Sequence, residues 1–164
     1  MWYITRRYIR LSLTTWGPVL TAMAVMFIAS AQPKLPPLTE PVTVYFSGAL
    51  PVFPGLWDLL IKKSAHVIAF GALALLNMRA LLAWRASLQE AAHLAIVFTV
   101  GYAMLDELHQ AFVPGRHASG LDIGLDFVGA ALFALLARRY YARHPRKLSE
   151  QRQRFMAILQ ENIG

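Results

Sequence analysis

The chain has no cysteine and few charged residues. Of its 164 residues, 15% are charged, and only nine are Asp or Glu. Without cysteine the protein has neither a disulfide framework nor a thiolate zinc site. Apolar residues make up 57% of the chain, and its mean hydropathy of +0.44 is too high for a small soluble domain, whose surface must be polar. The low charge content and the high hydropathy favour a membrane protein, and the length favours a single domain spanning residues 1–164.

The excess of basic residues gives a formal net charge of +7, which can indicate a nucleic-acid partner. In this chain, however, most Lys and Arg residues fall between apolar segments or after the last of them. That distribution is typical of membrane topology, so we expect the membrane and its lipids as partners, and no nucleic acid.

Four apolar segments are long enough, or nearly so, to cross a bilayer, which needs about 20 helical residues. They predict helices over residues 14–31, 64–84, 89–108 and 119–137. The third has a short apolar centre, at residues 91–105, and needs its polar ends to span. Because Gln32 and Pro33 make a poor cleavage site, we expect the first segment to be retained rather than removed as a signal peptide. The predicted fold is an all-α integral membrane bundle of four transmembrane helices.

The distribution of Lys and Arg predicts the orientation of this bundle. Twelve basic residues fall on one side of the membrane and four on the other. The smaller group consists of Lys34, Lys62, Lys63 and Arg116. Because basic loops stay in the cytoplasm, we expect both termini inside, in the cytoplasmic (inner) membrane of the cell.

Two segments outside the four helices complete the expected topology. Residues 32–61 contain six prolines and several aromatic residues, which suggests an extracytoplasmic loop lying against the membrane. Residues 138–164 form a basic cytoplasmic tail. Within it, Leu148, Arg152, Phe155 and Leu159 recur at helical spacing, which favours an amphipathic helix on the inner leaflet. A disordered basic tail is the alternative.

Polar residues gather at the expected outer ends of these helices. Residues 106–126, DELHQAFVPGRHASGLDIGLD, hold four of the nine acidic residues. The N-terminal end of the second helix adds a lysine and a histidine at the same level. The topology therefore predicts one site that is built by the second, third and fourth helices. Its residues are Lys63, His66, Asp106, Glu107, Gln110, Arg116, Asp122 and Asp126.

Spacing supports a shared site, because residues three or four apart lie on one helix face. Asp126 lies a full turn inside an apolar segment, where an acid normally faces the bundle interior with a partner. Gly129 and Ala130 would let a neighbouring helix approach closely.

Simpler roles exist for several of these residues. Lys63 can anchor a helix at the head groups, and Arg116 can pair with Asp106 or Glu107 to fix the loop. Ser119 can cap the fourth helix with Asp122 as its partner.

Other polar residues are expected to lie outside the site. We expect His109 and His117 to be loop histidines without a chemical role. Asn77 suits an interhelical hydrogen bond, and Arg79 suits extension toward the head groups.

The polar motifs resemble those of the VanZ-like family, whose pattern combines K-x-x-H, D-E-x-x-Q-x-F-x-P-G-R and D-x-x-x-N-x-x-G. Here they read KSAH at residues 63–66, DELHQAFVPGR at 106–116 and DIGLDFVG at 122–129. The chain departs from the pattern at Asp126, where the family usually has Asn, and at Lys62, where Asp is frequent. The resemblance implies a small multi-pass membrane protein and, as in the namesake, lowered sensitivity to the glycopeptide teicoplanin. It supplies no reaction and no cofactor.

Three functions fit these residues. The site can bind a cell-envelope lipid or lipid-linked cell-wall precursor, with Lys63 and Arg116 holding a phosphate beside Gln110 and Asp126. Alternatively, the protein is an enzyme on such a lipid, with His66 as base or nucleophile and Asp106, Glu107 and Asp122 orienting it or holding a cation. One histidine with carboxylates is a loose metal signature, so no metal site is predicted. The third candidate function is a small transporter, for which the acidic Asp126 inside a helix is the argument.

Overall fold

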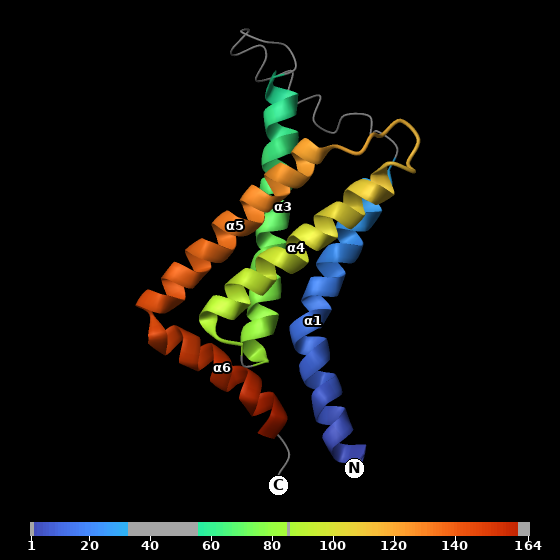
Figure 1. Cartoon of the computed structure of the whole chain (residues 1–164). Helices are drawn as coiled ribbons and strands as arrows, with labels where there is room; N and C mark the ends of the chain where they lie inside the picture. Colours follow the sequence, from blue (N-terminus) through green and yellow to red (C-terminus); the bar gives the residue numbers. More distant parts are fainter. Residues whose placement is uncertain (1, 33–55, 85, 161–164) are drawn as a thin grey trace.

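The structure is a computed structural model that describes residues 2–32, 56–84 and 86–160. These residues form five helices and no strand: α1 (Trp2–Ser30), α3 (Leu56–Ala83), α4 (Leu88–Gln110), α5 (Gly120–Arg143) and α6 (Pro145–Gln160) (Figure 1). Four stretches are long and apolar enough to cross a membrane: Tyr8–Ser30, Leu60–Ala83, Leu88–Gln110 and Gly120–Arg143. The prediction of an all-α bundle with four membrane spans is therefore confirmed.

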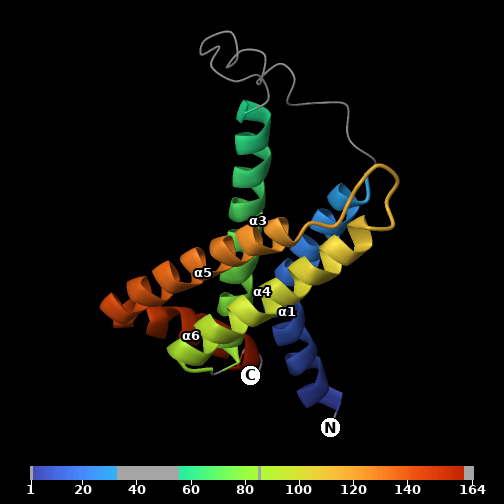
Figure 2. The same ribbon diagram turned by 45° about the horizontal axis from the view of Figure 1, so that its top comes forward.

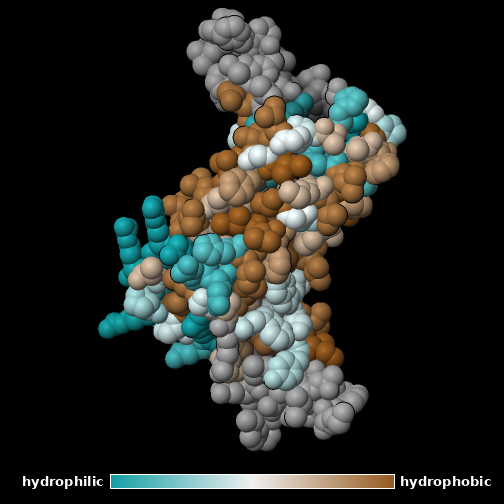
Figure 3. Space-filling view, in the orientation of Figure 1, coloured by the Kyte–Doolittle hydropathy of each residue, from teal (hydrophilic) through white to brown (hydrophobic). Residues whose placement is uncertain are grey.

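The face in Figure 3 carries a broad apolar band across the bundle, as lipid contact requires. Large apolar side chains such as Leu20, Val97 and Leu121 are exposed on the spans. They need the hydrocarbon of a bilayer to cover them. We therefore describe the chain as a multi-pass membrane protein.

Two helices are longer than their apolar runs. α1 begins at Trp2, ahead of the uncharged segment, and α3 begins at Leu56, where the sequence suggested a loop. The rest of that expected loop, residues 33–55, lies outside the described residues.

The starts of α4 and α5 follow sequence signals: Ser87 forms a capping box with Glu90, and the Ser119 side chain accepts a hydrogen bond from the Asp122 backbone N–H. The capping role expected of Ser119 is thus confirmed.

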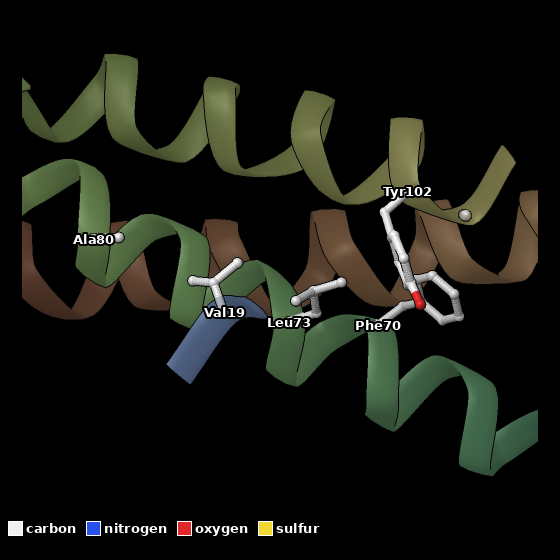
Figure 4. Close-up of a cluster of buried hydrophobic side chains, with 6 residues drawn as sticks. Val19, Phe70, Leu73, Ala80 and Tyr102 are labelled. Carbon is white, nitrogen blue, oxygen red and sulfur yellow. The ribbon is translucent and has the colours of Figure 1, made fainter. Parts of the chain in front are cut away.

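α3 is the central helix of the bundle. It packs against α4 and α5, which also contact each other, and α1 lies along α3 and α4 (Figures 1 and 2). A buried cluster joins the helices, and Figure 4 shows Val19 of α1 beside Leu73 of α3 and the Tyr102 ring of α4 against Phe70 of α3. Asn77 of α3 donates to the Thr99 hydroxyl of α4 at 3.1 Å, which is the interhelical hydrogen bond expected for Asn77.

Small residues bring α5 close to α3. A Cβ atom added to Gly129 of α5 would collide with the backbone carbonyl of Val67 on α3. Ala130, the next residue of α5, and Ala134, one turn after it, are fully buried against Ala74. Only side chains this small permit such an approach, so the role predicted for Gly129 and Ala130 is confirmed.

The described polar ends of four helices meet at one end of the bundle. α1 and α4 end there, whereas α3 and α5 begin there (Figures 1 and 2). This arrangement places the KSAH, DELHQ and SGLDIGLD stretches at the same level, as the alternating topology predicts.

At the opposite end, the basic tail forms α6 and folds back on the bundle. Phe155 is buried against Leu11 of α1 and Ala83 of α3, and Leu148 packs on the cluster that joins α3 and α4. The Arg152 guanidinium donates to the Ala86 carbonyl at 2.7 Å. The helix predicted for this tail is therefore present, but its apolar side chains Leu148 and Phe155 contact protein rather than a leaflet.

The contact between α3 and α5 can be tested with alanine at two glycines of α5. Gly129→Ala should lower the free energy of unfolding in detergent by about 1–3 kcal/mol, because its methyl group overlaps the Val67 carbonyl. Gly124→Ala is the matched control, since a Cβ there meets nothing within 4 Å. Thermal unfolding measures both. An equal melting temperature in the two variants would contradict the close approach.

Candidate functional site

Two residue pairs join α3 to α5 at the polar end. The Lys63 ammonium forms an ion pair with the Asp122 carboxylate. One turn deeper, His66 Nδ1 lies 3.3 Å from Asp126 Oδ1. The spacings of three residues on α3 and four on α5 place each pair on facing surfaces. The Gly129–Val67 contact lies directly below and fixes their register.

Asp126 is the most deeply buried member of these pairs. Its side chain is 1% exposed, and its Oδ2 atom has no hydrogen-bond partner among the described residues. A carboxylate in this position depends on His66 for compensation. When ionised, Asp126 accepts a hydrogen bond from Nδ1 of His66, which leaves Nε2 able to accept a proton.

A second polar network connects α4 with α1 and the loop after α4. Asp106 is buried, and its two oxygens accept hydrogen bonds from the Ser30 hydroxyl at 2.6 Å and from the Gln110 amide at 2.8 Å. The Gln110 carbonyl in turn accepts a hydrogen bond from Arg116 at 3.2 Å. The Asp106 carboxylate therefore fixes the amide that positions the Arg116 guanidinium.

Glu107 has a different role from its neighbour. One of its oxygens accepts a hydrogen bond from the Ser119 backbone N–H at 2.6 Å, which ties α4 to the residue that caps α5. Its other oxygen is buried without a partner among the described residues. Glu107 thus stabilises the loop between α4 and α5.

A cavity of about 220 Å³ lies between the two networks. Its polar wall consists of Ser30, His66, Asp106, Gln110 and Arg116. Apolar side chains complete it, among them Met26, Ala65, Ala69 and Phe70. Phe70 also packs on the Tyr102 ring, whose hydroxyl donates to the Met23 carbonyl at 2.6 Å. The cavity therefore combines an apolar wall with a few convergent polar groups, as small-ligand sites do.

The turn after α4 presents Arg116 to this cavity. Gly115 has a φ of 78°, which favours glycine, and the Arg116 N–H donates to the Val113 carbonyl at 3.1 Å. Gln110 is the hydrogen-bond partner of its side chain, and no carboxylate among the described residues forms an ion pair with it. The expected pair between Arg116 and Asp106 or Glu107 is therefore absent from this part of the chain, and the guanidinium is available to an anion.

The predicted site residues thus separate into three groups. His66, Asp106, Gln110 and Arg116 line the cavity, and Asp126 supports His66 from behind. Lys63 and Asp122 pair with each other and are not part of the cavity wall, and Glu107 faces the loop.

The structure also adds a helix to the site and relocates a histidine. α1 joins through Ser30, which the sequence marked only as the polar end of the first helix. His109 lies within α4 rather than in a loop, and its ring stacks on Phe27 at 4.1 Å.

The acidic residues are spread over these separate contacts. Within residues 2–32, 56–84 and 86–160, no three His, Asp or Glu side chains are grouped as a metal ion would require. The chemistry available to the cavity wall is hydrogen bonding, proton acceptance by His66 and charge pairing with Arg116.

Comparison with known proteins identifies the family. The VanZ/LLP1 family model matches residues 15–141, which is most of the chain and includes every residue of the cavity wall. The chain belongs to the VanZ/LLP1 family. The comparisons with curated proteins and with solved structures gave no match. The expected resemblance to VanZ-like proteins is thus confirmed.

The His66–Asp126 pair should act as a unit in stability measurements. His66→Ala leaves the buried Asp126 carboxylate without its partner, whereas His66→Ala together with Asp126→Ala removes both groups. We expect the losses of unfolding free energy in His66→Ala and in Asp126→Ala to be non-additive. The coupling energy in the double-mutant cycle should be about 0.5–3 kcal/mol. His93→Ala, at an exposed histidine of α4, is the matched control. Additive losses for His66 and Asp126 would contradict the pairing.

Proposed function

We propose that this VanZ/LLP1 protein binds the phosphate-bearing head group of a cell-envelope lipid or lipid-linked precursor in the cavity at its polar end. The observation that supports this most strongly is Arg116, a cation on the cavity wall that makes no ion pair with the carboxylates of the described residues. A guanidinium matches the geometry of a phosphate, and the apolar wall beside it suits the tail of an amphipathic ligand.

We infer an orientation with both termini inside, which puts this cavity at the outer leaflet of the cytoplasmic membrane. Support comes from the charge distribution, because α6, the C-terminal part of α5 and the N-terminal part of α1 together carry ten of the fourteen basic residues at described positions, and these parts lie at the end opposite the cavity. Both termini then lie in the cytoplasm, and the cavity meets lipids that face outward.

A role in glycopeptide sensitivity follows from binding at that leaflet. Cell-wall precursors carry lipid-linked phosphates, and glycopeptides act on precursors outside the membrane. A protein that holds such a precursor by its phosphate changes how much of it the drug reaches. Family membership supports this proposal for teicoplanin.

A second candidate function is an enzyme that cleaves a phosphate ester of the bound lipid. The His66–Asp126 pair favours it, because a buried carboxylate that orients a histidine is a common arrangement of a general base. His66 would take a proton from water as the water oxygen attacks phosphorus. The bond to the lipid oxygen then breaks, and the proton passes to that oxygen. Arg116 would stabilise the charge on the phosphoryl oxygens.

Orientation can be measured with single cysteines, since the chain has none of its own. Ser47→Cys should react with a membrane-impermeant thiol reagent in intact cells, whereas Ser149→Cys should react only after the cells are opened. Labelling at position 149 but not at position 47 in intact cells would show the opposite orientation.

Lipid binding should depend on Arg116. In detergent, Arg116→Gln should weaken binding of a labelled anionic lipid about 10- to 100-fold, the loss expected for a charged hydrogen bond of about 1.5–3 kcal/mol. Arg116→Lys should also weaken it, because an ammonium cannot bind bidentately. Arg139→Gln removes the same charge from the exposed far end of α5 and serves as control.

The outcomes of this experiment separate the candidates. Equal affinity of wild type, Arg116→Gln and Arg116→Lys for anionic and zwitterionic lipids would contradict a phosphate site. Binding without release of product, at any time of incubation, supports the binding function. Product that appears with wild type but not with His66→Ala at matched folding supports the enzyme instead.

A further inference from the structure

A second hollow lies at the end of the bundle opposite the polar cavity, where α3, α5 and α6 meet. Its inner part, of about 470 Å³, lies between α3 and α5 and is lined mainly by apolar side chains, including Leu75, Leu76, Phe133 and Leu136. Its outer part, of about 670 Å³, is lined mainly by polar side chains of α5 and α6, together with Arg79 of α3 and Thr14 of α1. The two parts adjoin because both are lined by Arg79, Tyr140 and Tyr141.

Basic side chains surround the outer part. Arg79 of α3 and Lys147 and Arg154 of α6 line it, against the single carboxylate of Glu150. Glu150 pairs with Lys147 at 3.5 Å, but Arg79 and Arg154 make no ion pair among the described residues. In Figure 3, hydrophilic side chains gather over this corner, directly below the apolar band. The charge of the hollow is therefore complementary to an anion.

Arg79 marks the depth of the hollow in the membrane. It lies four residues before the end of the Leu60–Ala83 span, and its guanidinium lies 5.2 Å from the centre of the Phe155 ring. Tyr140 and Tyr141 lie near the end of the Gly120–Arg143 span, where amphipathic rings usually meet the head groups. A cation at this level faces lipid phosphates, while the apolar part between α3 and α5 faces the acyl region.

α6 forms a wall of the hollow and is held against the bundle by two hydrogen bonds. Arg152 donates to the Ala86 carbonyl, and the Tyr141 hydroxyl donates to the Gln151 side chain. The face of α6 that lines the hollow is therefore held in a fixed position. This distinguishes the hollow from an open basic surface.

We propose that this hollow, lined by Arg79, Lys147 and Arg154, seats an anionic phospholipid of the leaflet opposite the polar cavity. The phosphate lies among the three cations, and an acyl chain follows α3 and α5 past Leu75 and Leu136. This site is independent of the head-group cavity, because the two share no lining residue.

Photocross-linking tests the proposal on the full chain in nanodiscs. The probe is phosphatidylglycerol with a diazirine in its acyl chain, diluted in phosphatidylcholine, and labelled peptides are identified by mass spectrometry. We expect labels on α3 around Leu75 and on α5 around Leu136. Lys147→Gln with Arg154→Gln should raise the probe concentration for half-maximal labelling by roughly fivefold for each cation removed. Arg139→Gln with Arg143→Gln removes two exposed charges beyond the hollow and should have a smaller effect.

A filling variant separates a seated lipid from general attraction to a basic surface. Leu136→Trp should block the apolar part and reduce labelling with every cation intact. Arg116→Gln should leave this labelling unchanged, because it alters only the other cavity. The proposal would be overturned by labelling that is unchanged in Leu136→Trp or equal for a phosphatidylcholine probe. It would also be overturned if the Lys147/Arg154 and Arg139/Arg143 double variants lowered labelling equally.

Discussion

The approach of α5 to α3 at Gly129 and Val67 is the contact on which the polar end depends. It fixes the register of the two helices, so that Asp126, one turn before Gly129, lies opposite His66, the residue before Val67. Asp122, a turn earlier again, then lies opposite Lys63. A carboxylate as deeply buried as that of Asp126 is costly without a partner, so the small side chain at position 129 is a condition for the acid at position 126.

The remaining polar contacts extend this arrangement around the cavity. On the α4 side, Asp106 accepts hydrogen bonds from Ser30 and Gln110, and Gln110 accepts one from Arg116. Among the described residues at this end, Lys63 pairs with Asp122 and His66 with Asp126, whereas Arg116 makes no ion pair. An arginine that makes no ion pair, on the wall of a cavity that also has apolar side chains, suits an amphipathic anion, which connects the geometry to the proposed lipid head group.

The sequence predicted the level of the site better than its internal pairing. Hydropathy and alternation of the helices placed KSAH, DELHQ and SGLDIGLD at one end, and helical spacing placed Asp126 inward. It could not predict that Glu107 faces the Ser119 N–H whereas Asp106 faces the cavity, because neighbouring residues on a helix point 100° apart and only packing decides which face is inside. The contribution of α1 was missed for a similar reason, since a serine at a helix end is common and only the fold brings Ser30 to Asp106.

The register of α3 and α5 can be measured most directly by cross-linking in native membranes. Because the chain has no cysteine, a short bifunctional thiol reagent joins only introduced pairs. Lys63→Cys with Asp122→Cys should cross-link within one chain much faster than Lys63→Cys with Leu121→Cys, since Leu121 is 82% exposed on another face of α5. Equal rates for the two pairs, or faster linking through position 121, would contradict the arrangement that places His66 against Asp126.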